Sequence, residues 1–227
     1  MISTWNALGP DANSHEELMV SFDENRKVRV LVLPALFDEA NLMRRFTLQM
    51  MRALDGRGID SFLPDLPGCN ESVAPLDSQT LAFWRQAAKR AADQLEATHV
   101  LAIRGGALIA PEFLAGWHYA SLTGAKLLRS MVRARMIASR EAGRDENSGT
   151  LLEAGRREGL VLNGWPIGAA MLRELESAEP KITDLQTNIV QSELGGAGLW
   201  LRAEPSEDEA QSQALAAILD TEQVEPG

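Results

Sequence analysis

The sequence predicts an α/β protein built on a doubly wound, mostly parallel sheet. Three short apolar runs end at proline or at a turn, as buried parallel strands do, and they lie at 28–34, 59–64 and 99–103. Amphipathic helical patterns at 39–54 and 80–96 separate these runs. Alternation of this kind requires right-handed crossovers and a sheet covered by helices on both faces.

The two helical patterns each follow from the spacing of their apolar residues. Residues three, four or seven apart lie on one face of a helix, and the charged residues fall on the other. Gly56 and Gly58 end the first pattern. The apolar positions are Leu42, Phe46, Met50, Ala53 and Leu54 in the first helix, and Leu81, Trp84, Ala88, Ala91 and Leu95 in the second.

The second half of the chain has a looser pattern. Pro111 leaves room for only a short helix after Arg104. We expect a last helix at 207–219 with Ser206 as its N-cap, and a frayed tail at 221–227. Between these points the expected elements are a strand at 113–119, a helix at 122–142, a loop at 143–149, a strand or turn at 160–167, a helix at 168–177, and strands at 185–191 and 199–203.

Length and composition favour one domain, covering 1–227, with a cap-like helical insertion at about 121–178. The chain has 227 residues, of which 45% are hydrophobic, so one α/β core suffices. A net charge of −10 disfavours nucleic acid and anionic membranes as partners. Cys69 is the single cysteine, and no Cys/His spacing predicts zinc, so we expect neither a disulfide nor a metal or other cofactor.

We expect a cytoplasmic location without membrane insertion. The first twenty residues contain polar and acidic side chains where a secretory signal would need a basic start and an apolar core. No run approaches the roughly 20 apolar residues that span a bilayer.

The turn after the third strand reads Ala102-Ile-Arg-Gly-Gly106. At this place an α/β-hydrolase carries the G-x-S-x-G elbow, which exposes a serine beside backbone donors. Arg104 stands at the serine position, and a guanidinium is no acyl acceptor because it stays protonated. The amides of Gly105 and Gly106, with Leu36 beside them, could instead form an anion site with Arg104. The alternative is that Arg104 turns away and pairs with Asp65 or Glu39.

A general base is also missing from its expected place. The loop after the last expected strand, at 203–207, contains no histidine, although a hydrolase would carry its histidine there. His15 lies in the N-terminal arm and His99 at the wrong end of its strand. His118 is the candidate nearest a strand's carboxyl end, and it either lines the pocket or is a partly buried polar residue.

Carboxylates offer a second possible chemistry. Asp38 and Glu39 follow the first strand and Asp65 ends the second, so they could converge for acid–base work or metal binding. Acids at these positions also cap helices and complement the helix dipole, which is the alternative we favour. Cys69 could be a nucleophile, but no histidine is placed to activate it, so a semi-buried thiol is expected.

The helix at 122–142 carries a basic stripe formed by Lys126, Arg129, Arg133 and Arg140. The stripe is either a solvated face or the positively charged side of a cap over the pocket near Arg104.

Several short motifs resemble the exosortase A system-associated hydrolases, particularly their type 2 group. The motifs are Val32 to Arg45, Leu63 to Ser72, Trp84-Arg85, Ile103 to Gly106, Trp117 with Gly124, and Asn163 to Ile167. The resemblance implies an α/β-hydrolase fold and a link to bacterial exopolysaccharide production and protein sorting. It also implies that arginine at the elbow is a trait of the group. The chain departs from the group at Pro111 and at 69–72, where the second glycine is absent.

Three functions remain open from the sequence. The first is a degenerate hydrolase that binds a small anionic or acyl-bearing ligand. The second is a non-serine hydrolase, similar to an esterase or thioesterase, in which Asp38, Glu39 or Asp65 activates water. The third is a non-enzymatic scaffold of the exopolysaccharide or sorting machinery. Besides a small ligand, the partners to be considered are a second copy of the chain, in a homodimer, or an exopolysaccharide-system protein.

Overall fold

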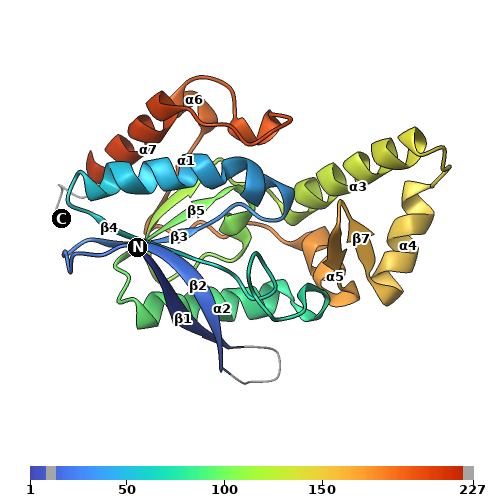
Figure 1. Cartoon of the computed structure of the whole chain (residues 1–227), viewed down its shortest axis with the longest axis horizontal. Helices are drawn as coiled ribbons and strands as arrows, with labels where there is room; N and C mark the ends of the chain where they lie inside the picture. The colour runs from blue at the N-terminus through green and yellow to red at the C-terminus, as the bar shows by residue number, and fades with distance from the viewer. Residues whose placement is uncertain (9–13, 222–227) are drawn as a thin grey trace.

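A computed structural model describes residues 1–8 and 14–221, and its centre is a seven-stranded sheet (Figure 1). Five neighbouring strands, β4, β3, β5, β6 and β9, run parallel to one another, which confirms the predicted doubly wound, mostly parallel sheet. In spatial order the strands are β1 (Ile2–Leu8), β2 (Ser14–Phe22), β4 (Asp60–Pro64), β3 (Arg29–Leu33), β5 (His99–Ile103), β6 (Ala115–Tyr119) and β9 (Gln186–Ile189).

The N-terminal arm is a β-hairpin that the sequence pattern did not predict. Strands β1 and β2 pair antiparallel, and β2 continues antiparallel onto β4. Alternate residues are buried, including Trp5 at 1% exposure and the carboxylate residue Glu17 at 2%. Because a buried glutamate breaks the usual alternation of apolar and polar residues, the strand period is hidden in the sequence.

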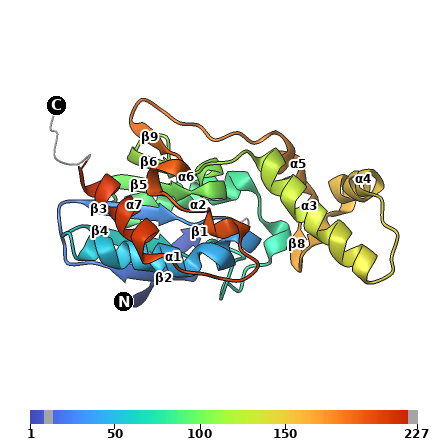
Figure 2. The same cartoon turned by 90° about the horizontal axis from the view of Figure 1, so that it is seen from above.

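Helices cover both faces of the sheet (Figure 2). Val30 and Val32 of β3 belong to the core under α1 (Asp38–Asp55) and α7 (Glu209–Thr221). Leu31 and Leu33 belong to the opposite core, under α2 (Leu81–Gln94). This alternation is what a strand buried on both faces requires.

The segment predicted as a cap leaves the sheet after β6 and returns at β9. Figures 1 and 2 show α3 and α4 extending beyond the end of the sheet. Helix α4 was not predicted, because its sequence is largely polar and contains two glycines. The elements are α3 (Gly124–Glu141), α4 (Ser148–Glu158), β7 (Leu160–Leu162), β8 (Trp165–Ile167) and α5 (Ala169–Ser177).

The C-terminal region differs from two sequence-based expectations. The predicted strand at 199–203 is wrong, since Leu199–Leu201 forms the short 3₁₀ helix η3. Ser206 is not the N-cap of the last helix, because α7 begins at Glu209 and the Asp208 carboxylate accepts the Gln211 N–H at 3.1 Å. The predicted frayed tail falls at 222–227, outside the described residues, apart from Thr221, which ends α7.

Short helices complete the chain. They are η1 (Leu76–Ser78), η2 (Arg104–Leu108) directly after β5, and α6 (Gln191–Leu194) after β9. Within residues 1–8 and 14–221, no helix is both long and apolar enough to cross a membrane.

Gly106 allows the turn after β5 to sit against the end of β3. A Cβ atom at this position would lie 2.5 Å from the carbonyl oxygen of Pro34 and 2.6 Å from that of Leu33. Both atoms are backbone, so neither moves without displacing the strand end that leads into α1.

We predict that Gly106→Ala lowers the free energy of unfolding by roughly 2–3 kcal/mol, because the added methyl group overpacks this backbone contact. Gly56→Ala is the matched control, since its Cβ would meet only ordinary contacts at 3.7 Å. The control should change stability by less than about 1 kcal/mol. Urea denaturation measures both, and equal effects would contradict the close-approach argument.

Candidate functional site

Arg104 occupies the turn that follows β5, at the carboxyl edge of the parallel strands where α/β proteins place their sites. Its φ angle is +53°, an uncommon conformation for a residue with a side chain. Phe37 before α1 and Ala120 after β6 also have positive φ, at 55° and 47°. The elbow therefore keeps the strained shape of a nucleophile turn although the residue there is an arginine.

The Arg104 guanidinium is held by a bidentate ion pair with Glu39. Its Nε donates to Glu39 Oε2 at 2.9 Å, and its Nη2 donates to Oε1 at 2.8 Å. Its Nη1 donates to the carbonyl of Ala120 at 2.9 Å. The two charged side chains are only 13% and 12% exposed. Of the two possibilities left open by the sequence, the structure shows the pairing with Glu39, so this charge is already neutralised.

Trp200 closes the remaining side of Arg104. The guanidinium carbon lies 4.0 Å from the centre of the indole ring, a cation–π contact. Trp200 belongs to η3, in the C-terminal region where a hydrolase would carry its histidine. Sequence reasoning missed this residue, since a contact between Arg104 and Trp200 leaves no local pattern.

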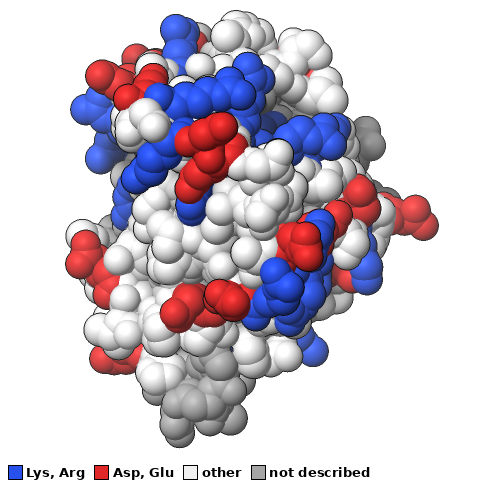
Figure 3. Space-filling view, turned by 90° about the vertical axis from the view of Figure 1, so that its right-hand side faces the viewer, with Lys and Arg blue, Asp and Glu red and all other residues white. Residues whose placement is uncertain are grey.

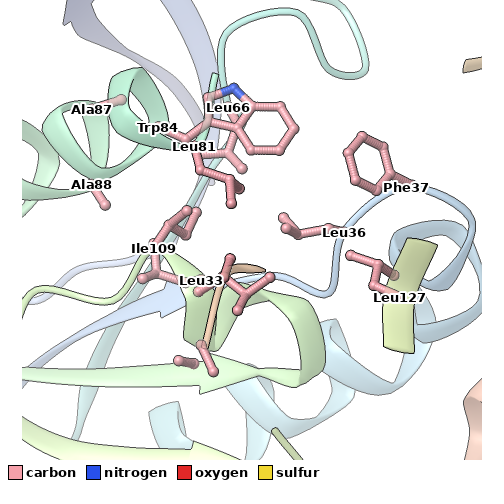
Figure 4. Close-up of a cluster of buried hydrophobic side chains, with 14 of the residues drawn as sticks. Leu33, Leu36, Phe37, Leu66, Leu81, Trp84, Ala87, Ala88, Ile109 and Leu127 are labelled. Carbon is pink, nitrogen blue, oxygen red and sulfur yellow. The ribbon is translucent and has the colours of Figure 1, made fainter. Parts of the chain in front are cut away.

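The predicted ligand-binding residues Gly105, Gly106 and Leu36 lie together but are covered. Leu36 is 2% exposed, and both glycines are buried. A Cβ at Gly105 would lie 3.0 Å from Leu36 and 3.3 Å from Leu127, so both side chains pack directly over this turn. Figure 4 shows Leu36 and Phe37 within a cluster of buried apolar side chains that also includes Leu127 and Trp84. A ligand would have to displace Leu36 to reach these glycines.

Asp38 fastens the β7–β8 hairpin to the start of α1. Its carboxylate accepts Trp165 Nε1 at 2.8 Å and Asn163 Nδ2 at 2.7 Å. The Trp165 ring also packs edge-on against Phe37, with ring centres 5.9 Å apart. Asn163 and Gly164 both have positive φ, which suits the two-residue turn of this hairpin. Asp38 therefore holds the β7–β8 hairpin, which carries Trp165, against the start of α1.

A small cavity of about 30 Å³ lies beside the elbow, under Trp165. Asp65 lines this cavity and is 7% exposed. Its carboxylate accepts a hydrogen bond from Asn70 Nδ2 at 2.5 Å and forms a longer ion pair with Arg44, whose Nη1 lies 3.8 Å from Asp65 Oδ1. Burial raises the pKa of Asp65, with Asn70 and Arg44 opposing the change. The wall of the cavity is mostly apolar and includes Leu36, Phe37, Met43, Leu63 and Leu66.

A second, more open hollow of about 240 Å³ adjoins this cavity. Arg44, Asp65 and Asn70 line both spaces. Leu18 and Met19 of β2 form part of its other wall. The three polar side chains thus stand between an enclosed apolar space and an open one.

The candidate acids each have a separate partner. Asp38 binds the hairpin, Glu39 binds Arg104, and Asp65 binds Asn70. Across the part of the chain that the structure describes, no three His, Cys, Asp or Glu side chains gather in a way that could hold a metal ion.

Cys69 borders the cavity as a partly buried thiol. Burial, with the nearby negative charges of Asp65 and Glu17, raises the pKa of Cys69 to about 12. Glu17 is itself buried and accepts the Ser72 hydroxyl at 2.7 Å, and burial raises the pKa of Glu17. A thiol in this environment stays protonated and is a poor nucleophile at neutral pH.

The three histidines do not supply a base at the elbow. His118 is fully buried in β6, where its Nε2 lies 3.1 Å from Gln186 Oε1, and burial lowers its pKa. His99 stacks on Trp117 at the amino end of β5. His15 is in β2 of the N-terminal hairpin.

Comparison with known proteins shows the fold. Alpha/beta hydrolase domain-containing protein 10 from mouse is 10% identical, covering 97% of this chain and 98% of its own, with a TM-score of 0.53. A proposed hydrolase from Agrobacterium vitis S4 is 12% identical over 98% of both chains, with a TM-score of 0.50. The chain thus has the α/β-hydrolase fold, and a fold alone does not fix an activity.

One further structure matches only part of the chain, and two other comparisons found no match. A bromoperoxidase from Bacillus anthracis matches 52% of this chain with 15% identity and a TM-score of 0.40, and the chain spans only 45% of that structure. No protein-family model and no curated protein sequence matches the chain.

The Arg104–Glu39 pair generates a stability prediction. Arg104→Met leaves the Glu39 carboxylate nearly buried and unpaired, so the free energy of unfolding should fall by about 3–5 kcal/mol. Glu39→Leu should cause a comparable loss, whereas the double variant Arg104→Met/Glu39→Leu should lose much less than the sum. Denaturant unfolding of all four proteins gives the coupling energy, and additive losses would contradict the ion pair.

Cys69 generates a reactivity prediction. At pH 8, iodoacetamide should alkylate it about 1000-fold more slowly than an ordinary thiol, because a pKa near 12 lowers the thiolate fraction by that factor. The same protein unfolded in guanidinium is the control and should react at the ordinary rate. Equally fast alkylation of folded and unfolded protein would overturn the raised pKa.

Proposed function

We propose that this α/β-hydrolase-fold chain has no serine-hydrolase chemistry and binds a small acyl-bearing anion beside its closed elbow. The observation that carries the proposal is the state of Arg104, which fills the nucleophile position and is neutralised by Glu39. Serine, histidine and accessible backbone donors would all be needed there for acyl transfer. None of the residues described at the elbow supplies the serine or the histidine.

The ligand site is the pair of adjoining hollows between α1, the loop after β4 and Trp165. Leu36, Phe37 and Met43 offer an apolar wall for a short acyl chain. Arg44 lies at the junction of the two hollows with its side chain 43% exposed, so its guanidinium can meet a ligand carboxylate. Asn70 adds an amide at the same place.

Access to the enclosed hollow passes the β7–β8 hairpin. Trp165 lines that hollow and is tethered by Asp38, so release of the 2.8 Å hydrogen bond would widen the space. A cavity of about 30 Å³ holds one or two water molecules, and a ligand larger than that requires this movement.

A second candidate function is hydrolysis by a carboxylate, and Asp65 is the observation in its favour. It is a buried acid with a raised pKa that faces a space large enough for water. In that case turnover of an ester and thioester panel should disappear in Asp65→Asn. Turnover that survives the substitution, or is absent from the parent protein, would contradict this second function.

The resemblance to the exosortase A system-associated hydrolases suggests the biological setting. We propose a role alongside bacterial exopolysaccharide production or surface-protein sorting, on the strength of the motifs at 32–45, 63–72 and 103–106. The alternative in the same setting is a scaffold protein that binds no small ligand. It predicts that no acyl-bearing anion binds at Arg44.

The test uses octanoate as the ligand probe and isothermal titration as the measurement. Arg44→Gln should weaken octanoate binding roughly 10- to 100-fold, because a hydrogen bond to a charged group contributes about 1.5–3 kcal/mol. Arg45→Gln, which removes the neighbouring exposed charge on α1 outside the hollows, should leave binding unchanged.

A fluorophosphonate probe tests the chemical half of the proposal. The parent protein should show no labelling, and strong labelling would contradict the absence of serine chemistry. No octanoate binding by the parent, or equal binding by parent and Arg44→Gln, would contradict the ligand site.

A further inference from the structure

Positive charge gathers on one helix of this acidic protein. The chain carries a net charge of −10, yet residues 124–147, which cover α3 and the loop after it, carry a net charge of +3. Figure 3 looks onto the end of the molecule where α3 and α4 lie, and lysine and arginine side chains gather across its upper part. The net charge of the whole chain therefore does not describe this face.

The cations of this face form a straight, exposed stripe. Lys126, Arg129, Arg133 and Arg140 are all exposed and recur at helical spacing. At 1.5 Å per residue the stripe is about 21 Å long. Among residues 1–8 and 14–221, none of the four forms an ion pair with a carboxylate.

The neighbouring cation Arg135 shows what a structural arginine looks like on the same helix. Its guanidinium makes a bidentate pair with Glu146 at 3.0 and 2.7 Å, and it donates to the Val161 carbonyl. Arg135, with Ser139, lowers the pKa of Glu146 to about 2. The stripe residues have no such role in the fold, so the structure leaves their charges free for a partner.

Apolar surface accompanies the stripe. Ile137 lies between Arg133 and Arg140 on the same face and is 48% exposed. Arg129 also borders an open groove of about 280 Å³ between α3, α4 and α5, whose apolar lining includes Leu128, Val132 and Leu152. Cations flanking apolar surface match an anionic headgroup with an acyl chain beneath it.

We propose that the α3 face docks on an anionic lipid bilayer surface. Clusters of four or more Lys and Arg on an amphipathic helix bind anionic headgroups, each contributing about a fivefold gain in binding. The exposed Ile137 among these cations supplies the apolar contact that an amphipathic helix makes at a bilayer surface. Figures 1 and 2 show this helix extending away from the sheet, so salt screens much of the repulsion from the acidic body beyond about 8 Å.

Vesicle co-sedimentation of the full chain tests the proposal. The protein should associate with phosphatidylcholine vesicles that contain phosphatidylglycerol and not with phosphatidylcholine alone, and added salt should weaken the association. Arg129→Gln/Arg133→Gln/Arg140→Gln should lower the partition coefficient about 100-fold. Ile137→Ser alone should lower it roughly tenfold, by removing apolar contact with the bilayer.

The matched control removes three exposed cations from α1 and α2, as Arg45→Gln/Arg52→Gln/Lys89→Gln. This control has the same net charge as the α3 variant and should retain vesicle binding. Thermal unfolding of both variants checks that they remain folded, as expected for exposed positions.

Three results would overturn the proposal. The first is no association with anionic vesicles at low salt. The second is an equal loss of binding in the two triple variants, which would indicate a whole-molecule charge effect. The third is binding of soluble polyglutamate through α3 without vesicle binding, which would indicate an acidic protein partner.

Discussion

The ion pair between Arg104 and Glu39 is the interaction around which the centre of this molecule is arranged. It joins the turn after β5 to the first turn of α1, and the same guanidinium also binds the Ala120 carbonyl and stacks on Trp200. Four segments that are distant in sequence therefore meet on one side chain. Because a nearly buried charge is costly when it loses its partner, Arg104 and Glu39 depend on each other.

This constraint explains why the carboxyl edge of the sheet has the shape of a hydrolase site without its chemistry. Positive φ angles at Phe37, Arg104 and Ala120 keep the strand ends in strained conformations, while Leu36 and Leu127 cover the turn. The open space lies beside the elbow, at Asp65 and Arg44. The proposed ligand site therefore lies beside the elbow and not at it, and the hydrogen bond from Trp165 to Asp38 holds one wall of that site in place.

The sequence predicts the parts of this fold that are written in local patterns. The runs at 28–34, 59–64 and 99–103 became β3, β4 and β5, since parallel strands buried on both faces are continuously apolar. The β1–β2 hairpin was missed because Glu17 is a buried acid satisfied by Ser72. The run at 199–203 resembled a strand, yet its tryptophan stacks on Arg104. The choice between Asp65 and Glu39 as the partner of Arg104 depended on three-dimensional distances that no spacing encodes.

The central claim is that Arg104 is a buried ion-pair partner and not a free cation at the elbow. Nitrogen-15 NMR of the arginine side chains tests it by measuring hydrogen exchange at the Arg104 Nε–H, with the exposed Arg45 as reference. The account predicts that the Arg104 proton exchanges far more slowly than that of Arg45 and that Glu39→Gln accelerates it. Equal exchange rates at the two arginines would contradict the account.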